Sequence, residues 1–208
     1  MVARREALLA LLGLWLGPGR ACAASSTWNE MPDGGPYVPT PQLVVERMLE
    51  LAKVGPKDLV YDLGSGDGRL VIEAARRHGA RGVGVERDAD LVERSRAGAI
   101  KAGVADRVRF LRGDFFEVDL RQTTVVTLYR LPEMMLRLSP KFRAELPAGA
   151  RIVSHDFPLT DWPQAAMLQF DSEEKEQNLG IGATQLFLYR APGPGAAVPR
   201  SPGSPGSR

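Results

Sequence analysis

The sequence contains very little cysteine and histidine. Among its 208 residues there are one cysteine, Cys22, and two histidines, His78 and His155. A single cysteine excludes a disulfide within the chain and a cysteine metal cluster. Cys22 also lies in a segment with the features of a cleaved leader, so the mature chain would have no cysteine nucleophile. Two histidines are too few for a histidine-based zinc site, and we therefore expect no bound metal.

The body of the chain lacks an excess of positive charge. Its net charge is +2, and the balance of residues 1–23 alone accounts for that value. The tail from Ala191 adds two arginines, which leaves residues 24–190 slightly acidic, at about −2. A surface that binds nucleic-acid phosphates is expected to be basic. We therefore expect no nucleic acid among its partners.

No apolar run is as long as the roughly 20 residues that span a bilayer. Residues 7–16 form a short apolar segment behind two arginines, and the small residues of 21–23 follow it. This order is typical of a secretory signal. Residues 1–23 are predicted to be a cleaved export signal, with an uncleaved N-terminal anchor as the alternative. The protein would then be periplasmic or membrane-anchored, but cytoplasmic if translation starts at Met31.

What the sequence does contain is a glycine-rich turn between a predicted strand and a predicted helix. Gly64, Gly66 and Gly68 alternate after the apolar strand 58–63, and an amphipathic helix, 69–78, follows. Glycine permits positive φ and has no Cβ, so a ligand can approach the backbone. The helix N-terminus presents free N–H groups to that ligand. The pattern indicates a nucleotide-binding corner.

The spacing of the glycines and the position of Asp62 narrow the choice of nucleotide. A dinucleotide site needs G-x-G-x-x-G, but position 69 is arginine, and no P-loop motif is present. Asp62 stands two residues before Gly64, where it would repel a pyrophosphate. A carboxylate at that place suits a cofactor that carries positive charge.

Strands and helices alternate along the body of the chain. Thr40 and Asp88 are predicted N-caps. Two final strands, 166–170 and 184–189, have no crossover helix predicted between them and should pair as an antiparallel hairpin. The other predicted strands are 58–63, 82–86, 107–112, 123–129 and 150–156, and the predicted helices are 42–54, 69–78, 88–102 and 132–146.

This alternation predicts an α/β fold, a doubly wound and mostly parallel seven-stranded Rossmann-like sheet with a C-terminal antiparallel hairpin. We expect an irregular arm over 24–39, one domain over 40–190 and a disordered tail over 191–208, because the tail is rich in proline, glycine and serine.

From about residue 36 to 190 the chain resembles the class I S-adenosylmethionine-dependent methyltransferases. The resemblance implies that the glycine turn holds S-adenosyl-L-methionine, that Glu86 binds the ribose hydroxyls and that Asp114 binds the adenine. Asp62, Glu86 and Asp114 stand at the ends of successive predicted strands. The implied cofactor-binding residues are Asp62, Gly64, Ser65, Gly66, Asp67, Gly68, Glu86, Arg87, Asp114 and Phe115.

A narrower set of motifs is similar to the protein-lysine methyltransferases of the mitochondrial ATP synthase c-subunit and adenine nucleotide translocase, and to their bacterial relatives. The motifs are Pro-Tyr-Val-Pro-Thr at 36–40, Gly-Ser-Gly-Asp-Gly-Arg at 64–69, Leu-Pro-Glu-Met-Met at 131–135, Arg-Ile-Val-Ser at 151–154 and Phe-Pro-Leu at 157–159. The resemblance implies a protein substrate, methylated on a lysine side chain, and an association with membranes. Residues 172–183 and the pair His155-Asp156 depart from the pattern.

The resemblance places the rim of the acceptor pocket at the arm and at the end of the fourth strand. Tyr37 and Tyr129 are therefore the candidate catalytic residues, and the alternative for each is a packing role. His155 and Asp156 are a candidate general base pair, with a structural role as the alternative. A small-molecule O- or N-methyltransferase and a non-catalytic cofactor-binding protein remain the alternative functions.

Overall fold

The computed structural model describes residues 37–196. The chain divides into two units, Met1–Met31 and Pro32–Arg208, and the described residues belong to the second. The predicted leader, most of the predicted arm and the tail from residue 197 lie outside the described residues. No helix in the described part is long and apolar enough to cross a membrane.

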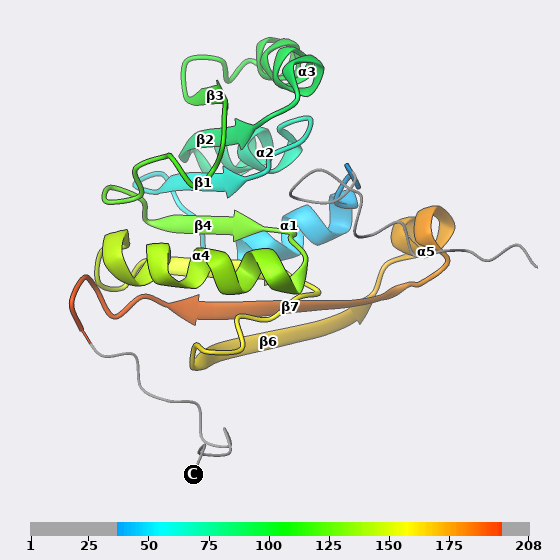
Figure 1. Ribbon diagram of the computed structural model, residues 1–208. Coiled ribbons are helices and arrows are strands. Elements are labelled where there is room, and N and C mark those ends of the chain that lie inside the picture. Colours follow the sequence, from blue (N-terminus) through cyan, green and yellow to red (C-terminus); the bar gives the residue numbers. More distant parts are fainter. Residues whose placement is uncertain (1–36, 197–208) are drawn as a thin grey trace, which may run out of the picture. The chain divides into compact units, whose positions relative to one another are not determined.

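Seven strands form one sheet, in the order β3-β2-β1-β4-β5-β7-β6 (Figure 1). The strands are β1 (Leu59–Leu63), β2 (Arg81–Glu86), β3 (Val108–Arg112), β4 (Val125–Leu128), β5 (Arg151–His155), β6 (Gln164–Asp171) and β7 (Ala183–Arg190). The helices are α1 (Gln42–Leu51), α2 (Arg69–His78), α3 (Ala89–Lys101), α4 (Pro132–Glu145) and α5 (Glu173–Leu179).

Strands β3, β2, β1, β4 and β5 are parallel, whereas β7 runs antiparallel to both β5 and β6. The predicted doubly wound sheet with a C-terminal antiparallel pair is therefore confirmed. The predicted bounds agree with the observed ones to within three residues, apart from α5, which was not predicted.

Helices cover both faces of the sheet, so its apolar strands are buried on two sides. Helix α4 lies on one face, and α1 and α2 lie on the other (Figure 1). The first layer packs α4 against β1, β4 and β5 through residues such as Leu138, Phe142 and Ile152, and the second packs α1 against the same strands through Val45 and Val153. The parallel strands are therefore a rigid support for the loops at their carboxyl ends.

The predicted helix ends are observed at two positions, the N-cap of α3 and the glycine that ends α2, and are not observed at the N-cap of α1. The side chain of Asp88 accepts hydrogen bonds from the backbone of α3, as predicted for an N-cap, and Gly79 ends α2 in a left-handed conformation with φ 67°. Thr40 is not the cap of α1. Pro41 holds that position, and the helix has no side-chain cap. The carbonyl of Thr40 accepts a bond from Arg69.

In the C-terminal part, one element was not predicted and one expectation is wrong. A short helix of seven residues, α5, lies between β6 and β7; it is not of crossover length, and the two strands pair antiparallel as expected. Disorder does not begin at Ala191, because its side chain is buried, at 4% exposure, and its N–H donates to the carbonyl of Ala150. The described chain continues to residue 196.

The register of the paired strands determines how far along the sheet each functional side chain lies. Asp62 of β1 is paired with Gly84 of β2 on one side and with Thr127 of β4 on the other, and Thr127 is paired in turn with Val153 of β5. The residues that follow these four leave the sheet at one edge. The loops after β1, β2, β4 and β5 therefore meet at the carboxyl ends of the parallel strands.

Candidate functional site

The glycine turn after β1 has a backbone that only glycine adopts without strain. Gly64, Gly66 and Gly68 have φ angles of 87°, 54° and 77°. A Cβ on Gly66 would lie 2.4 Å from Cε2 of Tyr37, and one on Gly68 would lie 2.5 Å from Cε1 of Phe110. The turn therefore needs glycine both for its conformation and for the close approach of neighbouring side chains.

Two carboxylates from the next strands reach the turn or its edge. The N–H of Gly66 donates to Oε2 of Glu86 over 2.9 Å, and the N–H of Arg87 donates to Oε1 over 2.8 Å. The guanidinium of Arg87 donates in turn to Oδ2 of Asp114 over 3.0 Å. The predicted ribose and adenine residues thus lie along one continuous edge with the turn.

Asp62 is buried at the centre of this edge. Its side chain is 7% exposed, and its Oδ1 accepts a 2.9 Å bond from the hydroxyl of Thr127. Burial raises the pKa of Asp62 to about 7, although the bond from Thr127 and the charge of Arg130 act in the opposite direction. The carboxylate lacks full compensation for its charge, so a positively charged ligand beside it would favour ionisation.

Arg130, which we had not predicted as a site residue, lies across the glycine turn. Its Nε donates to the carbonyl of Leu63 over 3.0 Å, and a Cβ built on Gly64 would be only 1.1 Å from Nη2. Its guanidinium also lies 5.4 Å from the centroid of the Phe115 ring. Phe115 is itself buried, at 5% exposure, so this predicted cofactor residue forms the floor below Arg130. The signal in the sequence is one arginine directly after the fourth strand.

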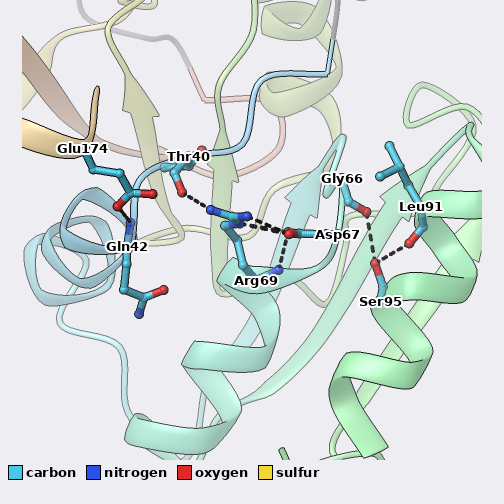
Figure 2. Close-up of polar contacts among 8 residues, drawn as sticks. All are labelled: Thr40, Gln42, Gly66, Asp67, Arg69, Leu91, Ser95 and Glu174. Atoms are coloured by element: carbon cyan, nitrogen blue, oxygen red, sulfur yellow. Dashed lines mark hydrogen bonds and ion pairs between the residues drawn. The ribbon is translucent and has the colours of Figure 1, made fainter. Parts of the chain in front are cut away.

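The arm before α1 is tied to the turn by a second arginine. The guanidinium of Arg69 donates to the carboxylate of Asp67, with a shortest separation of 2.7 Å, and Nη1 donates to the carbonyl of Thr40 (Figure 2). These contacts hold Tyr37 over Gly66. Burial, followed by the charge of Asp67, raises the pKa of Tyr37.

Three further hydrogen bonds in Figure 2 brace this region. The hydroxyl of Ser95 on α3 lies 3.0 Å from the carbonyl of Gly66 and 2.8 Å from that of Leu91. The backbone N–H of Gln42 donates over 2.8 Å to the carboxylate of Glu174 on α5. The start of α1 is thus joined to α5.

The second candidate catalytic residue, Tyr129, lies on the other side of the edge. Its ring packs on that of His155 with a centroid distance of 4.0 Å. Burial and the neighbouring Asp156 raise the pKa of Tyr129 to about 12, so its hydroxyl stays protonated. The structure therefore places Tyr37 and Tyr129 in different neighbourhoods, one over the glycine turn and one on the β4–β5 side.

The predicted general base pair His155-Asp156 is not supported. His155 is fully buried, and burial lowers its pKa to about 4. Its Nε2 is 3.4 Å from Oδ2 of Asp156, while that same oxygen accepts a 2.6 Å bond from Lys175. An imidazole closed off from solvent, beside a carboxylate already paired with a lysine, is poorly placed to take a proton from a substrate.

These features fit an adenosyl cofactor with a positively charged sulfur. The glycine turn leaves bare backbone, and buried Asp62 would gain from a neighbouring cation. Glu86 and Asp114 offer carboxylate oxygens to hydroxyl and amino groups. Within residues 37–196, no group of three or more histidine, cysteine, aspartate or glutamate side chains is placed to hold a metal ion.

The sheet, the glycine turn and the ordered carboxylates define an S-adenosylmethionine-dependent methyltransferase. Comparison with known proteins gives the family. The chain belongs to the ANTKMT methyltransferase family, because the model of the ANTKMT methyltransferase domain matches residues 62–166. The family resemblance drawn from the motifs is confirmed, and the protein is an enzyme that uses S-adenosylmethionine.

Two curated relatives and one solved structure illustrate the relationship. A protein-lysine N-methyltransferase of Saccharolobus islandicus is 47% identical over 61% of this chain and 80% of its own length. The adenine nucleotide translocase lysine N-methyltransferase of Mus musculus is 37% identical over 78% of this chain and 66% of its own. An RNA methyltransferase from Salinibacter ruber, solved with S-adenosyl-L-homocysteine, is 48% identical with a TM-score of 0.67, over 77% of this chain and 96% of that one.

Proposed function

We propose that the protein is a protein-lysine N-methyltransferase. The observation that carries the proposal is the 47% identity to a protein-lysine N-methyltransferase that the chain matches over 80% of its length. The expected cofactor roles of the residues at the carboxyl edge, from Asp62 to Asp114, belong to the same proposal. A small-molecule acceptor is less favoured, since α5, between β6 and β7, has only seven residues and a bulky protein can approach it.

The residues at the edge have distinct tasks in this reaction. When bound, S-adenosylmethionine supplies a methyl group, whose carbon bonds to the acceptor nitrogen as its bond to the sulfur breaks. Asp62 stabilises positive charge beside the turn, while Glu86 and Asp114 orient the nucleoside part. Tyr37 and Tyr129 exclude water on either side of the approach of the acceptor.

Lysine makes one demand that other acceptors do not. With a reference pKa near 10.4, its deprotonation at pH 7 costs roughly 4.6 kcal/mol. A partly desolvated pocket beside a cationic sulfur reduces this cost, because both effects favour the neutral amine. The proton leaves to water before attack, and the methylated nitrogen carries the positive charge that the sulfur loses.

We further propose that the target is associated with a membrane. The murine relative is named for the adenine nucleotide translocase, and the apolar segment at residues 7–16 would bring the enzyme to a membrane or export it. This part of the proposal concerns where the acceptor is and does not alter the chemistry at the site.

The deciding experiment offers the full chain three acceptors in parallel: membrane-protein extract, total RNA and a small-molecule extract, each with tritiated S-adenosylmethionine. We expect label on lysine in the membrane proteins, located by mass spectrometry. The variants Asp62→Ala and Glu86→Ala should lose the label together with cofactor affinity. Label in RNA alone, as the name of the Salinibacter protein suggests for that enzyme, or in small molecules alone would overturn the proposal.

A further inference from the structure

A buried polar cluster lies beside the carboxyl edge of the parallel strands. None of its residues has a role in the proposed binding of the cofactor. It consists of Tyr129, His155, Asp156 and Lys175, and we refer to it as the Lys175 cluster. The side chain of Lys175 is 5% exposed, and its Nζ donates to Oδ2 of Asp156 over 2.6 Å and to the carbonyl of Ala183. The ring of Tyr129 packs on His155 next to this ion pair.

The cluster is an unfavourable way to stabilise a fold. Within the described residues, neither ring nitrogen of His155 has a hydrogen-bond partner, although the side chain is fully buried. A buried lysine–carboxylate pair often stabilises a protein no more than apolar side chains of similar size would. Asp156 also has a left-handed backbone, with φ 58°. Such costs gathered at one place point to a function rather than to packing.

The backbone fixes the carboxylate of Asp156 at the end of β5. The N–H of Asp156 donates to the carbonyl of Gln185 over 2.7 Å, and the N–H of Gln185 donates to Oδ1 over 3.1 Å. Oδ1 is therefore occupied by the backbone of β7, whereas Oδ2 is left for an ammonium group. That place is now taken by Lys175.

The strand register places the cluster next to the glycine turn, where the methyl donor would bind. Thr127 of β4 bonds Asp62 and is paired with Val153 of β5. Tyr129 and His155 follow these two residues by two positions, so they extend toward the same face of the sheet. Neighbouring strands lie about 4.8 Å apart, so the cluster begins one strand away from the glycine turn.

We propose that the Lys175 cluster is the pocket for the acceptor lysine, and that Lys175 occupies it in place of the substrate. The carboxylate of Asp156 receives the ammonium of the acceptor, and Tyr129 and His155 line the passage for its hydrocarbon stem. This rests on the proposed function, whose substrate group it assigns to a place in the structure.

Two observations support displacement of Lys175. It has the same amine and four-carbon stem as the acceptor, and its carrier, α5, is a seven-residue helix that ends at Gly180 with φ 73°. Besides Lys175, an exposed bond from the backbone of Gln42 to Glu174 joins α5 to the rest of the domain. The buried N-cap Ser172 donates its N–H to the carbonyl of Gly182 and so closes the base of the segment. A protein that docks on α5 can therefore withdraw Lys175 by moving a short segment.

A test on the full chain uses n-butylamine, a mimic of the lysine side chain, and Nα-acetyl-lysine amide as the methyl acceptor. Lys175→Ala should gain thermal stability with added n-butylamine, while the wild type should not. Asp156→Asn should raise KM for the acceptor at least about tenfold, as expected for loss of a charge-assisted bond, with less than a threefold change in the Kd of S-adenosylhomocysteine. Lys175→Met should lower KM for the same acceptor.

A matched control tests whether the effects are specific to the Lys175 cluster, and a second variant covers the case in which Lys175→Met unfolds. Lys141→Met breaks another half-buried lysine–carboxylate pair, with Glu145, and should change neither KM nor the response to n-butylamine. If Lys175→Met unfolds, Lys175→Met/Asp156→Asn removes both charges and should retain the high KM. No amine response and an unchanged KM, in a wild type that methylates lysine, would overturn the pocket alone. A wild type that methylates only RNA would overturn the proposed function.

Discussion

The guanidinium of Arg130 lies against the bare α-carbon of Gly64, so close that a methyl group on that carbon would be 1.1 Å from Nη2. The two residues are far apart in the sequence and belong to the loops after β4 and β1. Burial lowers the pKa of Arg130, but the charges of Glu86 and Asp62 oppose this effect. A cation is thus held over the surface that the glycine turn offers to the cofactor.

We expect Arg130 to bind the carboxylate of the cofactor. Arg130→Leu should weaken S-adenosylhomocysteine by about 10- to 100-fold, the range for a lost hydrogen bond to a charged group. Decarboxylated S-adenosylmethionine should bind both proteins with nearly equal affinity. Calorimetry with the two ligands checks this, and an equal loss for both would show that Arg130 only shapes the turn.

Gly66→Ala should lower the affinity for the cofactor by more than its backbone strain alone explains. Its φ is 54°, and the new Cβ would meet the ring of Tyr37 at 2.4 Å. Gly103→Ala is the matched control, because its φ is 69° but nothing lies within 4 Å. A left-handed non-glycine residue costs about 1–2 kcal/mol in each case. Only Gly66→Ala should reduce cofactor affinity, and Tyr37→Ala should restore part of it.

Cofactor affinity should increase with pH because of Asp62. Its pKa is about 7 without a ligand, and a neighbouring cation favours the ionised form. Below that pH, Asp62 must release a proton when the cofactor binds. The Kd of S-adenosylmethionine should therefore fall by up to about tenfold for each unit that the pH rises from 5 to 7. Asp62→Asn should flatten this dependence. Asp119→Asn is the control, because hydrogen bonds from Arg121 lower the pKa of that exposed carboxyl to about 2.

His155 should make the protein sensitive to acid. Its pKa is about 4 in the fold and 6.5 unfolded, so the unfolded chain binds the extra proton between these values. The contribution of His155 to the free energy of unfolding should therefore fall as pH drops from 6.5 to 4, by at most about 1.4 kcal/mol per unit.

Asp62 has the opposite effect on the free energy of unfolding. Because its pKa is raised to about 7 in the fold, it stabilises the protein at low pH, and this stabilisation is lost as the pH rises to about 7. His155→Phe should then become more stable on acidification, and His155→Phe/Asp62→Asn should respond little. Urea unfolding from pH 4.5 to 7.5 measures all three proteins. Parallel curves for the wild type and His155→Phe would contradict the effect.

Arg69→Leu should release the arm from the turn. Arg69 joins the carboxylate of Asp67 to the carbonyl of Thr40, so its loss should speed hydrogen exchange across residues 37–42 and raise KM for a protein acceptor. Arg47→Leu removes an exposed ion pair with Glu50 on the next helix and should leave both values unchanged. Unaltered exchange in Arg69→Leu would show that other contacts hold the arm.

The cofactor corner could be predicted because its signals are local. Glycine spacing, the N-cap Asp88 and the apolar strands follow rules that act over a few residues, and the structure agrees with them. Arg130 was missed because only the folded sheet brings it to Gly64. Helix α5 was missed because it is polar apart from its last residue, Leu179, and its one buried side chain, Lys175, is of a type that is normally exposed.

The segment 172–182 connects β6 to β7. These two strands have eight residues each and pair with each other, so the segment leaves the sheet and returns to it at neighbouring positions. Both ends of the segment are therefore clamped, whatever its length or sequence. Its composition can diverge during evolution, or be exchanged between homologues in a chimera, while β6 and β7 keep their register. With the acceptor pocket that we propose, such changes would alter the choice of target and leave the glycine turn as it is.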